Sequence, residues 1–233
     1  MNKQNRFLPT TKDEMKQRGW DELDVVLITG DAYIDSPFMG IAVVGRILED
    51  IGLRVGIIGQ PDINSDVDVK RLGEPKLFWG VSGGSIDSMV SNYTATKKFR
   101  NDDDYTPGGK NNKRPDRATL VYTNLIRRYF KNTVPIVLGG IEASLRRLTH
   151  YDYWSNTLRK PILFDSKADY MIYGIGEQAI IDLGLYLKEG KDVRTIAGLC
   201  YISKEPVKEY LQIPSHKECL ENKEKYIDLF RAF

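Results

Sequence analysis

Short apolar runs alternate along this chain with stretches of helical periodicity. Five runs, each followed within two residues by glycine, are Val25–Thr29, Val55–Ile58, Leu77–Val81, Ile136–Leu138 and Tyr170–Tyr173. They are too short for helices, and their continuous apolar character is typical of strands buried on both faces of a parallel sheet. The pattern therefore predicts five parallel strands.

Apolar residues at helical spacing lie between these runs. The stretches are Phe38–Ile51, Ile86–Tyr93, Leu120–Tyr129 and Ala179–Leu187. Ser36 and Pro37 form an N-cap and first-turn pair, which predicts that the first helix begins there. Alternating strands and helices imply right-handed βαβ units. We therefore predict an α/β fold, a doubly wound, mostly parallel, flavodoxin-like sheet in a three-layer αβα arrangement, with strand order 2-1-3-4-5.

Two segments lie outside this repeating unit. Asn101–Thr119 combines acids, prolines, glycines and a basic cluster, so it is expected to be a long exposed loop. The sheet pattern ends near Ser203, which predicts a flavodoxin-like domain over residues 1–204. Residues 205–233 are expected to form a linker and one charged helix, and its unfinished apolar pattern indicates a boundary with a further domain.

Composition narrows the class of protein. The 233 residues carry 34 Lys and Arg against 32 Asp and Glu, a formal net charge of +2. No apolar run approaches the roughly 20 residues of a membrane span, and the N-terminus has no signal-peptide core. Two cysteines make neither a disulfide framework nor a metal cluster, and Cys200 lies in an apolar run, where a buried, inert thiol is expected. The sequence predicts a soluble, cytoplasmic protein without a membrane segment.

One stretch is locally basic. Residues 97–147 carry twelve basic and five acidic side chains, and tyrosines interleave with the basic ones, a pattern found in RNA-binding modules. Three consecutive acids, Asp102 to Asp104, interrupt it. Nucleic acid is therefore the least favoured partner, and RNA binding here would weaken steeply with salt.

The loops after the strands carry the candidate binding residues. They contain Gly30, Asp31, Ser82, Gly83, Gly84, Gly139, Gly140, Gly174 and Gly176. Glycine alone also serves a tight turn, so one such loop is weak evidence. Since the carboxyl ends of parallel strands share one edge of a sheet, four such loops predict a common cleft for a small molecule. No complete P-loop or dinucleotide motif is present.

Charged and polar candidates follow the same loops: Glu142, Arg146, Arg147, His150, Asp152 and Glu177. Glu142 and Glu177 fall in the first turns of helices, where a carboxylate is favourable without any ligand. The adjacent arginines suit a carboxylate or phosphate clamp, and equally a solvated helix face. His150 and Asp152 belong to an aromatic cluster that suits a ligand site or an interface. No residue is assigned a catalytic or metal-binding role.

These residues carry a family resemblance. The stretches PIVLGGIEASLRRLTHYDYW, FDSKADYMIYGIGE and DDDYTPGGKNNKRPDRATLVYTNLIR resemble the N-terminal region of YgiQ-type radical S-adenosylmethionine proteins. In that family a downstream Cys-x3-Cys-x2-Cys loop holds a [4Fe–4S] cluster, whose open iron binds S-adenosylmethionine. This chain contains no such triplet. The resemblance implies an accessory N-terminal domain whose partner is a downstream radical S-adenosylmethionine domain, and which does not hold the cluster itself.

The domain is also similar to the cobalamin-binding domains that precede many radical S-adenosylmethionine domains. It lacks their Asp-x-His-x-x-Gly motif, because Asp31-Ala32-Tyr33-Ile34-Asp35 follows the first strand. Cobalamin would therefore bind only without a histidine ligand. The alternative function is a free-standing domain that binds cobalamin, a nucleotide or another phosphate-bearing ligand without catalysis.

Overall fold

The fold is built on one six-stranded sheet. The computed structural model describes residues 7–207 and 209–232; residues 1–6, Lys208 and Phe233, which belong to the segments assigned above, lie outside the described residues. The strands stand in the order β2-β1-β3-β4-β7-β8. Their bounds are β1 Val25–Thr29, β2 Val55–Gly59, β3 Phe78–Ser82, β4 Ile136–Gly139, β7 Tyr170–Ile172 and β8 Leu199–Tyr201.

The first five strands in the sheet confirm the predicted order and direction. β2, β1, β3, β4 and β7 pair in parallel, with Val25 opposite both Val55 and Phe78. β8 was not predicted, and it pairs antiparallel with β7. It has three partly exposed residues, too few to show a strand pattern in the sequence. Cys200 lies on it and is only partly buried, which corrects the expectation of full burial.

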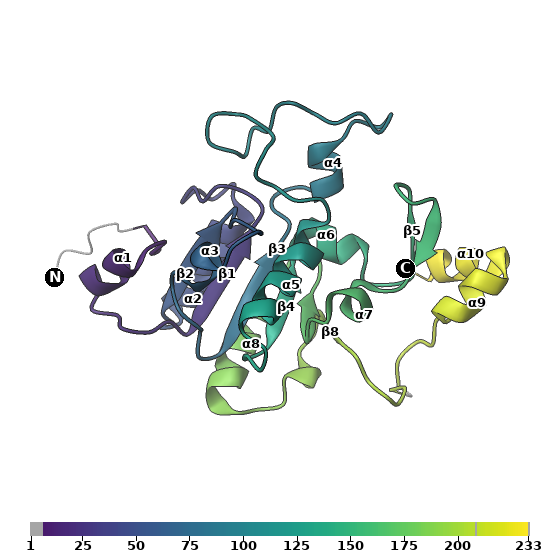
Figure 1. Cartoon of the computed structure of the whole chain (residues 1–233). Coiled ribbons are helices and arrows are strands. Elements are labelled where there is room, and N and C mark those ends of the chain that lie inside the picture. Colours follow the sequence, from purple (N-terminus) through teal and green to yellow (C-terminus); the bar gives the residue numbers. More distant parts are fainter. Residues whose placement is uncertain (1–6, 208, 233) are drawn as a thin grey trace.

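Helices cover both faces of the sheet. Their bounds are α1 Lys12–Gln17, α2 Gly40–Asp50, α3 Val67–Lys70, α4 Ser88–Asn92, α5 Ala118–Tyr129, α6 Gly140–Leu145, α7 Ile162–Ser166, α8 Glu177–Glu189, α9 His216–Glu221 and α10 Lys223–Arg231, with a 3-10 turn at Val193–Thr195. Side chains along a strand alternate between faces. Val25 and Leu27 pack with α2 and α8, whereas Val26 and Ile28 pack with α3, α5 and α7. This is the predicted three-layer αβα arrangement (Figure 1).

The first long helix begins later than predicted. α2 starts at Gly40 with Met39 as its N-cap residue. The Met39 N–H donates to the Ser36 carbonyl at 3.0 Å, and the Phe38 N–H donates to the Ser36 hydroxyl at 3.3 Å. Ser36 and Pro37 therefore form a separate turn before the helix. That turn leaves the side chain of Phe38 in solvent.

The segment over residues 101–119 is irregular up to the start of α5 and many of its residues are exposed, as predicted, but Arg114 fastens it to the sheet. Arg114 is fully buried, with Nη2 2.9 Å from Oδ1 of Asp31 and 3.2 Å from Oδ2 of Asp103. Its Nη1 donates to the Gly83 carbonyl at 3.2 Å. Two carboxylates on one guanidinium satisfy charges that would otherwise be costly to bury. The basic residue at the centre of this loop thus holds the chain together across the ends of β1 and β3.

The C-terminal segment contains two short helices where one was predicted. Asn222 has extended backbone angles, which end α9, and its side chain accepts from the Glu224 N–H at 2.9 Å to start α10. Ser215 and Glu218 form a capping box on α9. Both helices lie beside the hairpin of β5 His150–Asp152 and β6 Thr157–Arg159, at one end of the sheet (Figure 1).

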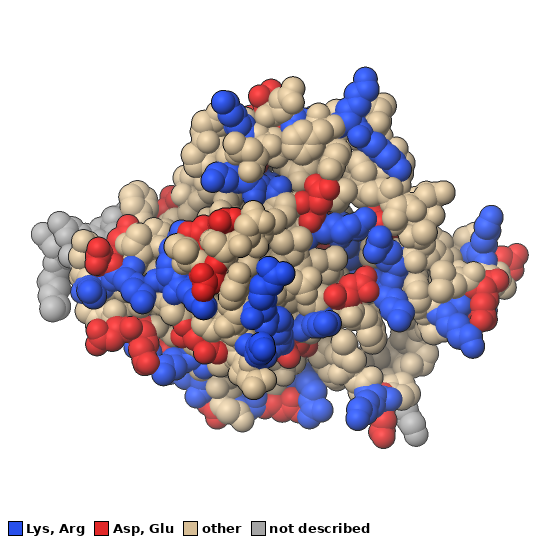
Figure 2. Space-filling view, in the orientation of Figure 1, with Lys and Arg blue, Asp and Glu red and all other residues tan. Residues whose placement is uncertain are grey.

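Over residues 7–207 and 209–232, no helix has the length and apolar character needed to cross a bilayer. On the face shown in Figure 2, basic and acidic side chains are interspersed over the surface.

Candidate functional site

A cavity of about 500 Å³ lies at the carboxyl ends of the central strands, under α2 and α8. It exists because the residues of the middle strands that face these helices are small. Gly80 and Ser82 of β3 and Gly139 of β4 line it and leave space that larger side chains would fill. A Cβ atom at Gly80 would lie 2.5 Å from Cδ2 of Leu27. The cavity thus follows directly from glycine inside a strand.

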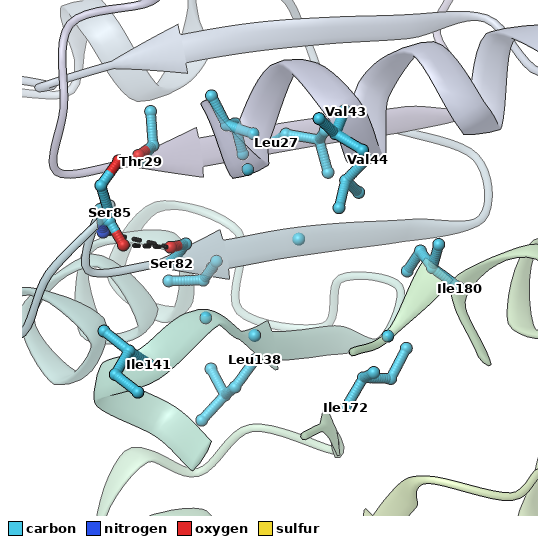
Figure 3. Close-up of a pocket in the computed structure, with 18 of the residues that line it drawn as sticks. Leu27, Thr29, Val43, Val44, Ser82, Ser85, Leu138, Ile141, Ile172 and Ile180 are labelled. Atoms are coloured by element: carbon cyan, nitrogen blue, oxygen red, sulfur yellow. Dashed lines mark hydrogen bonds between the residues drawn. The ribbon is translucent and has the colours of Figure 1, made fainter. Parts of the chain in front are cut away.

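The interior of the cavity is apolar. Four aliphatic side chains surround the open space: Leu27 of β1, Val44 of α2, Ile172 of β7 and Ile180 of α8 (Figure 3). Over the part of the chain that the structure describes, the charged lining residues are two acids, Asp31 and Glu177, and no lysine, arginine or histidine lines the cavity. An apolar interior with two carboxylates favours an uncharged group over a phosphate.

Polar groups order the β3 end of the rim. Oδ2 of Asp31 accepts from the Ser85 N–H at 2.6 Å and from the Ser85 hydroxyl at 2.7 Å. The Ser82 hydroxyl accepts from the Gly84 N–H at 3.1 Å (Figure 3). Since Oδ1 of Asp31 also forms an ion pair with Arg114, both carboxylate oxygens contact groups that hold this loop. We therefore assign Asp31 a positioning role at the rim.

Apolar side chains surround the mouth. Phe38 is 91% exposed, Ile141 is 44% exposed and Ile175 is 95% exposed, and all three line the cavity entrance. They follow three different strands: Phe38 comes after β1, Ile141 lies in α6 after β4, and Ile175 comes after β7. We call these three residues the apolar collar. Large apolar side chains gathered in solvent around a cavity mark an interaction surface.

The predicted binding residues divide into three groups. Eight line this cavity: Asp31, Ser82, Gly84, Gly139, Gly140, Gly174, Gly176 and Glu177. The geometry therefore brings all four glycine loops to one edge, as predicted, while ligand binding by them stays a prediction. The other seven residues lie elsewhere.

Gly30 and Gly83 do not line the cavity. A Cβ atom at Gly30 would lie 2.1 Å from the Gly83 carbonyl oxygen, and one at Gly83 would lie 2.5 Å from Oε2 of Glu142. Glycine is needed at Gly30 because a side chain would collide with backbone, and at Gly83 because it would collide with the Glu142 side chain. Glu142 is fully buried and accepts from the N–H groups of Ser88 and Thr119 at 2.9 and 3.0 Å, so it caps the first turns of α4 and α5.

Arg147 does not line this cavity. Its guanidinium stands over the ring of Tyr173 at 5.0 Å, and its Nη1 donates to the Ser144 carbonyl at 3.0 Å. The neighbouring arginines therefore have different surroundings, which the sequence pair did not reveal.

Arg146, His150 and Asp152 meet at a second cavity of about 370 Å³. Asp152 accepts from Arg117 Nη2 at 2.7 Å and Arg159 Nε at 2.8 Å. Although burial alone would raise it, the pKa of Asp152 is held far below its usual range by these bonds. Burial, together with the nearby charge of Arg146, lowers the pKa of His150, so its ring is neutral at pH 7.

Sequence reasoning missed the residues that form the interior of the first cavity. Gly80 lies within an apolar run, and its signal was a glycine in a strand where a branched residue is expected. Val44 and Ile180 looked like ordinary core residues of amphipathic helices. The chain has two cysteines, and among the described residues no group of three or more His, Cys, Asp or Glu side chains is placed to hold a metal ion.

A family model described as Radical SAM N-terminal matches residues 7–233. The chain belongs to this family. The resemblance drawn from the sequence is thereby confirmed.

A UPF0313 protein of Fusobacterium nucleatum is 59% identical over 98% of this chain and 40% of its own length. UPF0313 proteins of Thermotoga maritima and Clostridium botulinum strain 657 are 52% and 49% identical over 97% of this chain and 40% and 36% of theirs. The chain thus spans about two fifths of the length of these relatives.

Solved structures of the radical S-adenosylmethionine methyltransferase TsrM from Kitasatospora setae share the fold. One, with its tryptophan substrate and a S-adenosylmethionine analogue, matches with a TM-score of 0.52 and 19% identity over 78% of this chain and 29% of that chain. Another, with cobalamin and a [4Fe–4S] cluster, has a TM-score of 0.50 at the same identity. At this identity the likeness establishes the α/β fold alone.

Proposed function

We propose that this chain acts as the accessory N-terminal domain of a radical S-adenosylmethionine [4Fe–4S] enzyme, with its carboxyl-edge cavity turned toward the catalytic domain. The observation that carries the proposal is the apolar collar. Exposed Phe38, Ile141 and Ile175 need a covering surface, and they encircle a cavity where sheets of this type bind ligands. The greater length of the relatives supplies a candidate for that surface.

In the whole protein the downstream domain would supply the cluster and S-adenosylmethionine, whose reductive cleavage gives a 5′-deoxyadenosyl radical. The residues of this chain would bind and orient the ligand in the cavity, and they would exclude water from it. The collar would seal the junction between the two domains against solvent. Asp31, through Ser85 and Arg114, would keep the rim of the cavity in one conformation.

The docking proposal is tested with the remainder of the Fusobacterium nucleatum relative, produced as a separate polypeptide with its cluster reconstituted. We expect it to associate with this chain in sedimentation velocity. Phe38→Asp combined with Ile175→Asp should abolish association, because charges would enter an apolar interface. Val67→Asp is the matched control, since Val67 is 70% exposed and lies outside the collar. Association that survives the double substitution contradicts the proposal.

Cobalamin is the candidate ligand for the cavity itself, and the lining residues fit part of the cobalamin molecule. Leu27, Val44, Ile172 and Ile180 would surround a flat apolar group, and the strand-end glycines allow close approach of a large polar ring. No histidine lines the cavity, so these residues fit cobalamin without a histidine–cobalt bond. One TsrM structure contains cobalamin. Cobalamin carries one phosphodiester, whereas ATP carries a triphosphate. Because the described lining residues include two carboxylates and no lysine or arginine, the triphosphate is the poorer fit.

The ligand proposal is tested by titrating this chain with hydroxocobalamin and, separately, ATP, while following absorbance and heat. We expect saturable binding of hydroxocobalamin, and Gly80→Val should weaken it at least about tenfold because the added side chain moves Leu27 into the cavity. Gly190→Ala, far from the cavity, gives the comparison. Tighter binding of ATP, or equal hydroxocobalamin binding by Gly80→Val, contradicts this assignment.

A further inference from the structure

A second cavity of about 370 Å³ lies at the C-terminal end of α6. Gly140 and Ile141 at the N-terminal end of this short helix line the first cavity, whereas Leu145 at its C-terminal end lines the second. The remaining walls come from α4, the β5–β6 hairpin and α10. The two cavities are therefore neighbours with different linings.

The second cavity contains a buried arginine, Arg146, whose side chain makes few hydrogen bonds to the rest of the protein. The Arg146 side chain is 8% exposed, and its Nη2 donates to Oδ2 of Asp87 at 3.2 Å. Within the described part of the chain, that is the one hydrogen bond its guanidinium makes. The other Asp87 oxygen caps α4 by accepting from the Met89 N–H at 2.8 Å. Since a guanidinium has five N–H donors, most of those on Arg146 remain for a ligand.

Among the described residues that line this cavity, Arg146 is the one arginine or lysine, and Asp87 and Asp152 are the acids. Asp87 pairs with Arg146, and Asp152 pairs with Arg117 and Arg159, which lie outside the lining. Both carboxylates therefore already have cationic partners, and Arg146 is the cation that a ligand in the cavity would meet. His150 adds no charge at neutral pH, because its ring is neutral.

The opposite walls of the cavity are apolar and partly aromatic. Val90, Leu145 and Phe230 are 53%, 57% and 71% exposed at its edge. The Tyr226 hydroxyl accepts from the Tyr151 N–H at 3.0 Å, which fastens α10 to the hairpin as one wall. Tyr151 itself also lines the space. These walls would contact a flat apolar body while its charged end met Arg146.

We propose that this second cavity binds a small organic carboxylate with a flat apolar body, and that Arg146 holds the carboxylate. The planar fork of an arginine matches the two oxygens of a carboxylate. The volume lies at the lower end of the range for small-molecule sites. This site is separate from the carboxyl-edge cavity and does not depend on the function proposed for it.

Calorimetric titration of this chain with indole-3-acetate, and with its uncharged isostere indole-3-acetamide, tests the proposal. We expect the carboxylate to bind and the amide to bind at least about tenfold more weakly, because a charge-assisted hydrogen bond is lost. Arg146→Gln should weaken binding of the carboxylate by a similar factor. The charge-matched control Arg147→Gln should not, because Arg147 lies over Tyr173 and outside the cavity.

A second variant guards against misfolding, since Arg146→Gln leaves Asp87 without its partner. Val90→Phe occupies the cavity from an exposed position and keeps the Arg146–Asp87 pair. It should also abolish binding of indole-3-acetate. Equal binding of acid and amide, undiminished binding by Val90→Phe, or no binding of the acid at millimolar concentration would each overturn the proposal.

Discussion

At the scale of single residues, glycines that look alike in the sequence have different physical roles. Gly30 and Gly139 both follow predicted strands, yet a Cβ atom would meet the backbone oxygen of Gly83 at 2.1 Å in the first case and nothing within 4 Å in the second. Backbone cannot move aside as a flexible side chain can. The first glycine is therefore structural, and the second leaves open space beside the cavity.

Gly30→Ala should accordingly lower the free energy of unfolding by about 1–3 kcal/mol or more, the usual cost of forcing atoms into a packed region. Gly139→Ala should change it by less than about 1 kcal/mol, since its backbone is extended and its surroundings are open. Urea titration of both variants measures the difference. Equal destabilisation would show that the close approach of Gly30 to Gly83 is not tight.

Asp152 gives a prediction for acid stability. Its pKa is depressed in the folded chain, whereas the unfolded value is near 3.9. Its stabilising contribution is therefore complete above about pH 5 and is lost progressively as the pH falls below that value. Asp152→Asn should lower the free energy of unfolding at pH 7 by about 1.5–3 kcal/mol through the loss of charged hydrogen bonds. The gap between variant and parent should narrow below about pH 5, and a gap that widens there contradicts the assignment.

At the scale of elements, the local pattern of apolar and polar residues predicted some strands and helices and missed others. β1 was readable because five consecutive buried residues face both helical layers. β8 was not, since three half-exposed residues at an edge have no distinctive pattern. The start of α2 was misplaced because Ser36 closes a turn of its own. Residues far apart in sequence, such as Arg114 and Asp31, meet only through the fold, so their pairing was invisible beforehand.

The 101–119 loop yields a second prediction at this scale. Arg114→Ala leaves Asp31 and Asp103 buried without their cation, which should lower the free energy of unfolding by about 3–5 kcal/mol. It should also speed amide hydrogen exchange in the loop. Lys113→Ala, an exposed neighbour, should change stability by less than about 0.5 kcal/mol. Slow exchange that persists in Arg114→Ala would mean that other contacts fasten this loop.

At the scale of the whole molecule, the glycine-marked strand ends were the part of the site that the sequence could predict. Parallel strands necessarily bring their carboxyl ends to one edge, so four loops could be placed together without coordinates. The depth of the cavity could not be foreseen, because it depends on Gly80 lying beneath α2 and α8 rather than on any loop. Nor could the second cavity, whose walls include α10 from the far end of the chain.

We propose that the carboxyl edge, with its apolar collar, faces the downstream part of the longer relatives. The most direct measurement is an experimental structure of the full-length Fusobacterium nucleatum relative with its cluster and S-adenosylmethionine bound. The account predicts that the residues equivalent to Phe38, Ile141 and Ile175 are buried against the downstream domain, with the cavity opening toward it. A downstream domain packed on another face, with those three side chains still in solvent, would contradict it.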